Sequence, residues 1–226
     1  FQLFCEPTDM GAQATSDDAI VVVSNQAPAS VNIVRSLGRR GVRTIAAADR
    51  AHTPAVASRY CDEAVELPDP FADMLAYRDA LLSLAERPAV RTIAPVREPD
   101  VYVLSQYRRR FGDHVATLWP DAETLAQAHD RIALVDAARA AGVAVPETEL
   151  LTAVEAWDGR RIVKGRYGFL ADQYVDGLDA GTGQQMINTQ YIEPDSRPDV
   201  DTLVERMGHE PIVQEYVEGE SLRDLL

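Results

Sequence analysis

Short apolar runs alternate with longer helical patterns through the first half of the chain. Residues 19–23 (Ala-Ile-Val-Val-Val) form a continuous apolar run, which is typical of a strand buried on both faces. Further elements follow in alternation, with strands predicted at 42–48, 64–67 and 91–96 and helices at 31–41, 71–86 and 100–110. Such alternation indicates βαβ units and a parallel sheet. The sequence therefore predicts an α/β fold, with a doubly wound domain over residues 19–118 after a tail of residues 1–18.

The second half of the chain has a different organisation. Its predicted elements are helices at 121–127, 130–141 and 199–207, an extended segment at 143–151, and strands at 160–164 and 211–217. Residues 165–198 are polar and contain several glycines, so they are expected to be mostly loop. This pattern predicts a helical linker over residues 119–150 and a small α+β lobe over residues 151–217.

Polar residues follow the strands of the predicted parallel sheet. Ligands of such sheets bind beyond the carboxyl ends of the strands, which here are the loops 24–30, 49–54 and 96–99. The candidates to contact a small-molecule substrate in these loops are Asn25, Ser30, Arg97 and Glu98.

Composition excludes several classes of protein. The chain carries 36 acidic and 22 basic side chains, a net charge of −14, so its surface should repel nucleic acid. No apolar run approaches the ~20 residues that cross a bilayer, and the start lacks a secretory pattern. The two cysteines and four scattered histidines form neither a disulfide framework nor a zinc pattern. We therefore expect a cytoplasmic protein that binds neither nucleic acid nor membrane, with no metal ligand to name.

Lysine is nearly absent from the chain. Of the 22 basic residues, Lys164 is the single lysine, which suggests a GC-rich genome or a salt-loving, haloarchaeal host with an acidic proteome. A compact ammonium can lie between phosphate oxygens where a planar guanidinium cannot. The predicted strand places Ile162 and Lys164 on one face and Val163 on the other. Lys164 is thus a candidate phosphate contact, with an ordinary surface lysine as the alternative.

A dinucleotide-binding enzyme is a second interpretation of the first domain. Asp49 ends the second predicted strand, where an acid that binds ribose would lie. The turn at 24–30, however, contains no glycine, whereas close approach to a pyrophosphate requires Gly-x-Gly-x-x-Gly there. An NAD-dependent enzyme therefore stays an alternative that lacks its main motif.

Three motifs resemble, in order, those of the ATP-grasp ligases. Residues 130–148 begin Asp-Arg and end Ala-Gly-Val-Ala-Val-Pro-Glu-Thr, residues 162–165 read Ile-Val-Lys-Gly, and residues 214–219 read Gln-Glu-Tyr-Val-Glu-Gly. They are similar to the family's Asp-Lys helix, its Val-Val-Lys-Pro strand and its Gln-Glu-Tyr-Val-x-Gly hinge. The resemblance is to carboxylate–amine ligase-like members and the large chain of carbamoyl-phosphate synthase. It implies a Rossmann-like pre-ATP-grasp domain followed by an incomplete ATP-grasp α+β domain.

The resemblance assigns cations to the phosphates of ATP. Lys164 would contact the α- or β-phosphate, and Arg166 would add a second cation. Arg131 stands where the family has a lysine at the helix start, and Gly165 stands where it has a proline.

The resemblance also assigns the hinge segment to the nucleoside. Glu215 and the peptide groups of Tyr216 and Val217 would meet the adenine edge, with one carbonyl as acceptor and one N–H as donor. Gln214 would support the hinge, and Glu220 would lie near the ribose hydroxyls. This interpretation requires the Lys164 ammonium to lie against the hinge segment rather than in open solvent.

The implied activity is ATP-dependent joining of a small carboxylate to an amine, or to a thiol, through an acyl phosphate. The family uses Mg²⁺ as well as ATP, and its metal ligands are expected after Leu226, so residues 218–226 would begin a further lobe. We therefore expect the 226-residue chain to be inactive by itself. A homodimer is considered, and a non-catalytic nucleotide- or metabolite-binding module is the other alternative.

Overall fold

The computed structural model describes residues 17–24, 26–175, 178, 181, 183–185 and 189–219. The chain divides into two compact units. The first comprises the chain up to Pro68 with Tyr77–Asp100 and Tyr107–Leu118, and the second comprises Asp69–Ala76, Val101–Gln106 and the chain from Trp119 onward.

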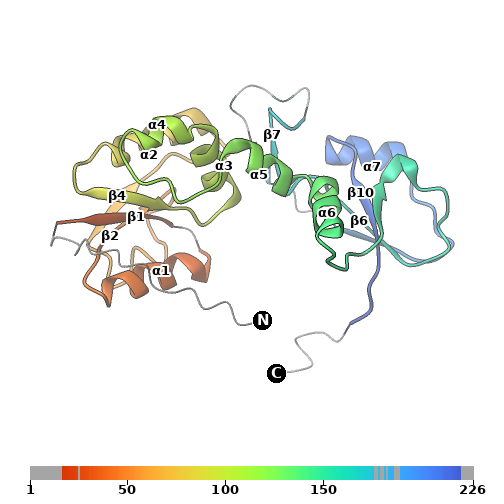
Figure 1. Ribbon diagram of the computed structural model, residues 1–226, viewed down its shortest axis with the longest axis horizontal. Helices are drawn as coiled ribbons and strands as arrows, with labels where there is room; N and C mark the ends of the chain where they lie inside the picture. Colours follow the sequence, from red (N-terminus) through yellow and green to blue (C-terminus); the bar gives the residue numbers. More distant parts are fainter. Residues whose placement is uncertain are drawn as a thin grey trace. The chain divides into compact units, whose positions relative to one another are not determined.

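The first unit is built on a parallel four-stranded sheet. Its strands are β1 (Ala19–Ser24), β2 (Arg43–Ala48), β3 (Glu63–Glu66) and β4 (Val90–Ala94), in the order β3-β2-β1-β4. Helix α1 (Pro28–Gly38) lies on one face and α2 (Met74–Ala85) on the other (Figure 1). The predicted doubly wound parallel sheet is thereby confirmed. Because β2 and β4 lie on opposite sides of β1, the strand order reverses between β1 and β4.

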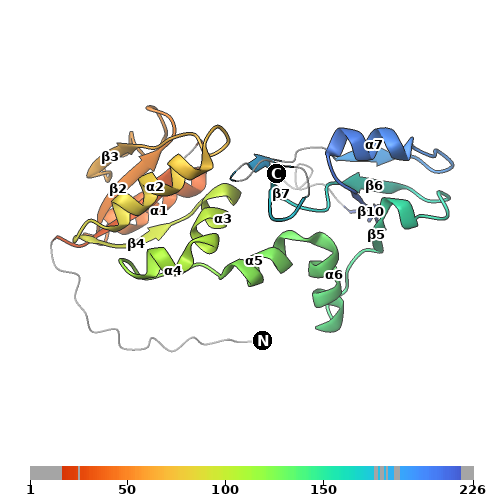
Figure 2. The ribbon, with the colours of Figure 1, turned by 90° about the horizontal axis from the view of Figure 1, so that it is seen from above.

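The apolar run of β1 explains its central place in this sheet. Val21, Val22 and Val23 are fully buried, since both faces of the strand are covered by helices. By contrast, β3 lies at the edge of the sheet (Figure 2), and its residues alternate between half-buried and exposed. The contrast matches the stronger apolar pattern of 19–23 and the weaker one of 64–67.

Four helices follow β4 along the chain. They are α3 (Glu98–Gln106), α4 (Arg108–Gly112), α5 (Ala122–His129) and α6 (Arg131–Ala140). Asp121 caps α5 by accepting the N–H of Thr124, and Asp130 caps α6 by accepting the N–H of Ile132. Asp130 therefore separates two helices that would otherwise run together.

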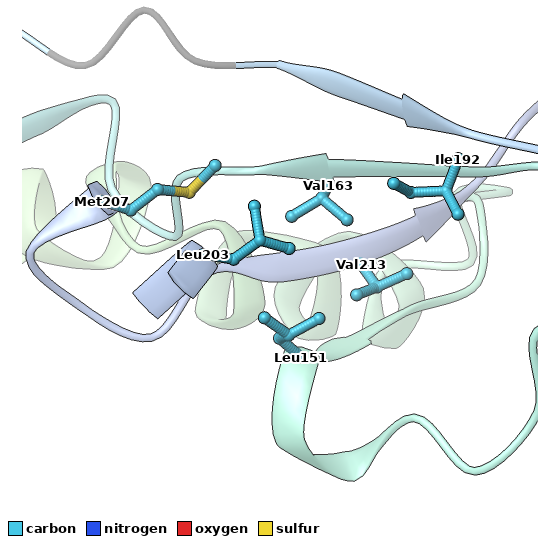
Figure 3. Packing of buried hydrophobic residues seen from close by; sticks show 6 residues of the cluster. All are labelled: Leu151, Val163, Ile192, Leu203, Met207 and Val213. Carbon is cyan, nitrogen blue, oxygen red and sulfur yellow. The ribbon is translucent and has the colours of Figure 1, made fainter. Parts of the chain in front are cut away.

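The second unit contains an antiparallel sheet of order β5-β10-β6-β9. Its strands are β5 (Thr148–Leu150), β6 (Arg161–Lys164), β9 (Gln190–Ile192) and β10 (Ile212–Glu215). Helix α7 (Val200–Met207) packs on one face, where Leu203 and Met207 meet Val163 and Val213 (Figure 3). Leu151, in the short 3₁₀ turn Leu151–Ala153, joins the same core.

Three short strands lie in the region expected to be mostly loop. They are β7 (Phe169–Ala171), β8 (Gly183–Gln185) and β9, each three residues long. β7 and β8 pair with each other, whereas β9 pairs with β6. Strands this short leave almost no periodic pattern, so the loop prediction is wrong at these positions. By contrast, β5 lies within the segment 143–151 that is expected to be extended.

Gly38, at the end of α1, allows close packing of Tyr60. A Cβ at this glycine would lie 2.6 Å from the Cβ of Tyr60. We predict that Gly38→Ala destabilises the chain by about 1–3 kcal/mol, because helix and loop must separate. Urea unfolding measures this change. Gly159→Ala is the matched control, since nothing lies near its added methyl, and an equal effect of both substitutions would contradict the packing argument.

Candidate functional site

The sheet of the second unit carries its candidate residues on one face. Side chains alternate between faces along a strand, and Val163 and Val213 point into the core against α7. Gln214 pairs with Ile162 of β6 and with Thr148 of β5, so these three side chains share the opposite face of the sheet. Lys164 lies two residues after Ile162 and therefore lies on that face as well. The predicted separation of Lys164 from Val163 is confirmed.

Lys164 is anchored by a chain of hydrogen bonds across three strands. Its Nζ donates to Oε1 of Gln214 at 2.6 Å. Nε2 of Gln214 donates to Oγ1 of Thr148 at 2.8 Å, and that hydroxyl donates to the carbonyl of Pro146 at 3.0 Å. The ammonium thus lies against the hinge segment, as the sequence interpretation requires.

The charge of Lys164 is not neutralised within the part of the chain that the structure describes. Its hydrogen-bond partner is a neutral amide, and no described carboxylate lies within ion-pair distance of Nζ. Burial, and then the positive charge of Arg131, lower the pKa of Lys164. An anion would relieve both effects, so the site is suited to bind one.

Arg131 borders this position from the start of α6. Its guanidinium donates to the carbonyls of Gly165 and Tyr167, the latter at 3.2 Å. Its backbone N–H also donates to the carbonyl of Arg166 at 3.0 Å. Arg131 therefore holds the turn after β6 in place, close enough to Lys164 to lower its pKa.

Arg166 is engaged by Asp130 in a two-pronged ion pair. Its Nε donates to Oδ1 at 3.0 Å and its Nη2 donates to Oδ2 at 2.6 Å. Burial acts to raise the pKa of Asp130, but Arg166 and the N–H of Ile132 outweigh it and the pKa is lowered. The Arg166 charge is therefore largely compensated, unlike that of Lys164.

His209 supports the same turn from the far end of α7. Its Nε2 accepts the N–H of Arg166 at 2.9 Å, and its Nδ1 lies 2.8 Å from the carbonyl of Met207. A ring that accepts at Nε2 and donates at Nδ1 is neutral. Burial is the main cause of the lowered pKa of His209, and Arg166 and Arg131 add to it against the opposing carbonyl of Met207. Nothing in the sequence pattern singled out this histidine.

The hinge segment leaves an acceptor and a donor on one edge. The N–H of Glu215 donates to Glu147 on the β5 side, and that of Tyr216 donates to Arg160 on the β6 side. The alternation places the Glu215 carbonyl and the Val217 N–H on the β5 side. Among the described residues, neither group has a hydrogen-bond partner.

Side chains of the hinge are also ordered. The guanidinium of Arg160 lies 4.4 Å from the ring centroid of Tyr216, and Tyr191 meets that ring edge-on at 6.1 Å. The backbone N–H of Tyr216 is already hydrogen-bonded to the carbonyl of Arg160. It is therefore not placed to meet the adenine edge, as the resemblance implied for the peptide groups of Tyr216. Glu220 lies outside the described residues.

Arg97, a candidate of the first unit, is held between two carboxylates. Nη1 donates to Asp49 Oδ2 at 2.6 Å, and the guanidinium lies 3.1 Å from Asp100 Oδ1, which also accepts from the Tyr77 hydroxyl. Burial acts to lower the pKa of Arg97, but Asp100, Tyr77 and Asp49 raise it above its ordinary value. This buried network joins the carboxyl ends of β2 and β4.

The other candidates of the first unit are placed differently. Ser30 is buried in the first turn of α1, where its hydroxyl donates to the carbonyl of Ala27 at 3.1 Å. Glu98 is exposed at the start of α3. Asn25 lies outside the described residues. The β1–α1 and β4–α3 connections, next to which Ser30, Arg97 and Glu98 lie, flank the reversal of strand order between β1 and β4, where ligands of such sheets bind.

The described residues hold no group of three or more His, Cys, Asp or Glu side chains that could bind a metal. Magnesium prefers clustered carboxylate and carbonyl oxygens. By themselves, these residues therefore provide no cluster of three or more such ligands for Mg²⁺.

Comparison with known proteins shows the fold. No protein-family model matches the sequence, and a search of curated proteins returns no match. Among solved structures, N5-carboxyaminoimidazole ribonucleotide synthetase from Thermotoga maritima is similar with a TM-score of 0.53 and 15% identity over 90% of this chain and 47% of that one. L-amino acid ligase from Bacillus licheniformis is similar with a TM-score of 0.56 and 15% identity over 89% and 45%.

A third similar structure is the biotin carboxylase domain of 2-oxoglutarate carboxylase from Hydrogenobacter thermophilus, solved with ADP and magnesium. Its TM-score is 0.57, with 14% identity over 88% of this chain and 44% of that one. All three are ATP-grasp enzymes, and the expected combination of a Rossmann-like domain with part of an ATP-grasp domain is confirmed. The chain spans about half the length of the structures it matches.

His209 predicts a specific pH dependence of stability. Because its folded pKa lies below the ordinary 6.5, the unfolded chain takes up a proton first on acidification, and stability falls below about pH 6.5. We expect His209→Gln to weaken this loss in urea unfolding at a series of pH values. His114→Gln, at an exposed histidine, is the control and should leave the profile unchanged. An unaltered profile in His209→Gln would show that another group is responsible.

Proposed function

We propose that this chain provides the nucleotide-binding part of an ATP-dependent ligase of the ATP-grasp type. The observation that carries the proposal is the ammonium of Lys164, which is half-buried and lies against the hinge without a described carboxylate partner. The triphosphate of ATP is the ligand that such a site would take. The similar structures supply the fold, and one of them is a ligase by name.

ATP would lie on the face of the second sheet that α7 does not cover. Lys164 would contact its α- or β-phosphate, with Arg131 beside it. Arg166 would act mainly on the turn, because Asp130 already compensates its charge. Gln214 would keep the ammonium aimed at the phosphates, since its amide binds both Lys164 and Thr148.

The adenine edge would meet the backbone of the hinge. Adenine presents a donor at N6 beside an acceptor at N1, which matches a carbonyl and an N–H on one strand edge. We assign these to the Glu215 carbonyl and the Val217 N–H. Glu220 stays a candidate for the ribose hydroxyls.

The proposed reaction joins a small carboxylate to an amine. When bound, ATP supplies the phosphoryl group that activates the carboxylate as an acyl phosphate. The residues of this chain would hold the phosphates and exclude competing orientations. Asn25, Ser30 and Glu98 stay candidates for substrate contact at the carboxyl edge of the first sheet, whereas Arg97 would shape that edge through its ion pairs.

Two alternatives differ in what they require. A nucleotide-binding module without chemistry would use the same Lys164 site, so ATP binding without ATP turnover in the full-length protein would favour it. An NAD-dependent enzyme would use Asp49 on the ribose, but that carboxylate is bound to Arg97 and the glycine motif is missing. We therefore favour the ligase.

Other expectations stay proposals. Among the described residues, no helix is long and apolar enough to cross a membrane. We retain the cytoplasm as the proposed compartment on the sequence evidence, with no nucleic-acid partner and a homodimer as one possible assembly. Mg²⁺ as a second cofactor and a salt-rich habitat also stay predictions.

Lys164 provides the direct test of nucleotide binding. We expect Lys164→Gln to weaken ATP affinity by about tenfold or more, because a charged hydrogen bond to phosphate is lost. Isothermal titration with ATP measures the change. Arg139→Gln, an exposed residue of α6, is the control. Equal ATP affinity in Lys164→Gln and the unaltered chain would refute the site.

Val217 tests the adenine contact separately. Val217→Pro removes the N–H, whereas Val217→Ala retains it and trims a side chain that is 62% exposed. We expect the proline variant to bind ATP about three- to tenfold more weakly and the alanine variant to bind normally, since one neutral hydrogen bond is lost. Titration with inorganic triphosphate, which has no adenine, should not distinguish the two variants. If the two variants bind triphosphate with different affinities, the proline acts through the fold of the hinge.

A further inference from the structure

An arginine-lined cavity lies at the opposite edge of the first unit from the proposed substrate loops. Its walls come from the end of α1 and from the loop before β3, near the amino ends of the parallel strands. The cavity measures about 410 Å³, and its lining consists of Arg35, Arg39, Ala57, Ser58, Arg59 and Tyr60. That size suits a small molecule.

The lining contains three guanidinium groups and no acidic side chain, in a chain of net charge −14. Five other arginines of this unit are paired with carboxylates, whereas Arg40, Arg50, Arg109 and Arg110 form no ion pair with a described carboxylate. The pairs are Arg43 and Arg87 with Glu63, Arg78 with Asp79, Arg91 with Asp18, and Arg97 with Asp49 and Asp100. By contrast, no described carboxylate forms an ion pair with Arg35, Arg39 or Arg59. Three arginines without an ion-pair partner among the described carboxylates therefore meet at this cavity.

The arrangement has an electrostatic cost that a ligand would remove. Arg35 and Arg39 are four residues apart on α1, a spacing at which like charges repel. The helix dipole favours each of them at this end of α1, but it does not account for Arg59, which comes from a different segment. A bound anion would offset the repulsion among all three.

Two hydroxyl groups add donors to the cavity. The phenol oxygen of Tyr60 accepts from Arg59 at 2.7 Å, and Oγ of Ser58 accepts the N–H of Tyr60 at 3.3 Å. Each hydroxyl can therefore donate its own hydrogen to a ligand. Arg59, and after it Arg39, lowers the pKa of Tyr60. Gly38 permits this geometry, because any side chain there would displace Tyr60.

We propose that this cavity binds the phosphate group of a small molecule. Three guanidinium forks and two hydroxyls match the several oxygens and double negative charge of a phosphate. One face of the Tyr60 ring is covered by Arg59, so recognition rests on the phosphate rather than on stacking of an aromatic ligand. The site is separate from that of Lys164 and does not depend on the proposed ligase activity.

The test uses the 226-residue chain with two probes, inorganic phosphate and glycerol 3-phosphate. Amide shifts of Ser58, Arg59 and Tyr60, followed by two-dimensional NMR during titration, should saturate with each probe. The double variant Arg39→Gln/Arg59→Gln should weaken binding at least about tenfold, and Arg109→Gln, at an exposed arginine of α4, should leave it unchanged. Tighter binding of glycerol 3-phosphate would identify a phosphate monoester as the ligand, and equal binding would identify free phosphate.

Two results would overturn the proposal. One is an equal response to sodium chloride at matched ionic strength, which would indicate screening alone. The other is retention of affinity in the double variant.

The titration is repeated with Lys164→Gln as a control for the other unit. The shifts at Ser58 to Tyr60 should persist in this variant, and their loss would assign phosphate binding to the other unit and contradict the proposal. Circular dichroism confirms that each variant is folded, and Tyr60→Phe, which removes only a hydroxyl, provides a milder second variant that should also bind more weakly.

Discussion

The hydrogen bond between Lys164 Nζ and Gln214 Oε1 joins the two central strands of the second sheet on the face that α7 leaves open. Its geometry depends on the register of β6 with β10, because a slip of one residue in either strand would turn that strand's side chain into the core. That register is in turn fixed by Val163 and Val213 packing against Leu203 and Met207. The apolar core on one face therefore determines where the cation lies on the other.

The turn after β6 shows how the chain holds a cation near other cations. Arg131 binds backbone carbonyls, Arg166 is compensated by Asp130, and His209 accepts an N–H in its neutral form. If His209 were protonated, its Nε2 could no longer accept that hydrogen bond, and a further positive charge would lie among three others. The neutral ring is thus part of what keeps the surroundings of Lys164 ordered.

Sequence patterns predicted the parts of this structure that depend on local periodicity. The run at 19–23 and the spacing around Lys164 led to the correct strands, and the order of three short motifs led to the correct fold. The three-residue strands β7, β8 and β9 were missed, because they exist only through pairing with distant segments. The Arg97–Asp49 pair spans 48 residues of sequence, and no pattern in one sequence links two such positions. For the same reason the role of His209 beside Arg166, 43 residues away, could not be anticipated.

The cations of this chain differ in whether a nearby carboxylate compensates their charge. This difference says more about their roles than whether the residue is lysine or arginine. In a protein with 36 acidic side chains, several arginines have carboxylate partners, among them Arg97 with two and Arg166 with one. A cation left without such a partner costs stability wherever it is partly buried or close to others of its sign. Lys164 bears the cost of burial, and Arg35, Arg39 and Arg59 bear that of mutual repulsion. Because a bound anion would offset the cost at either place, the lack of an ion pair with any described carboxylate supports the anionic ligands proposed for both.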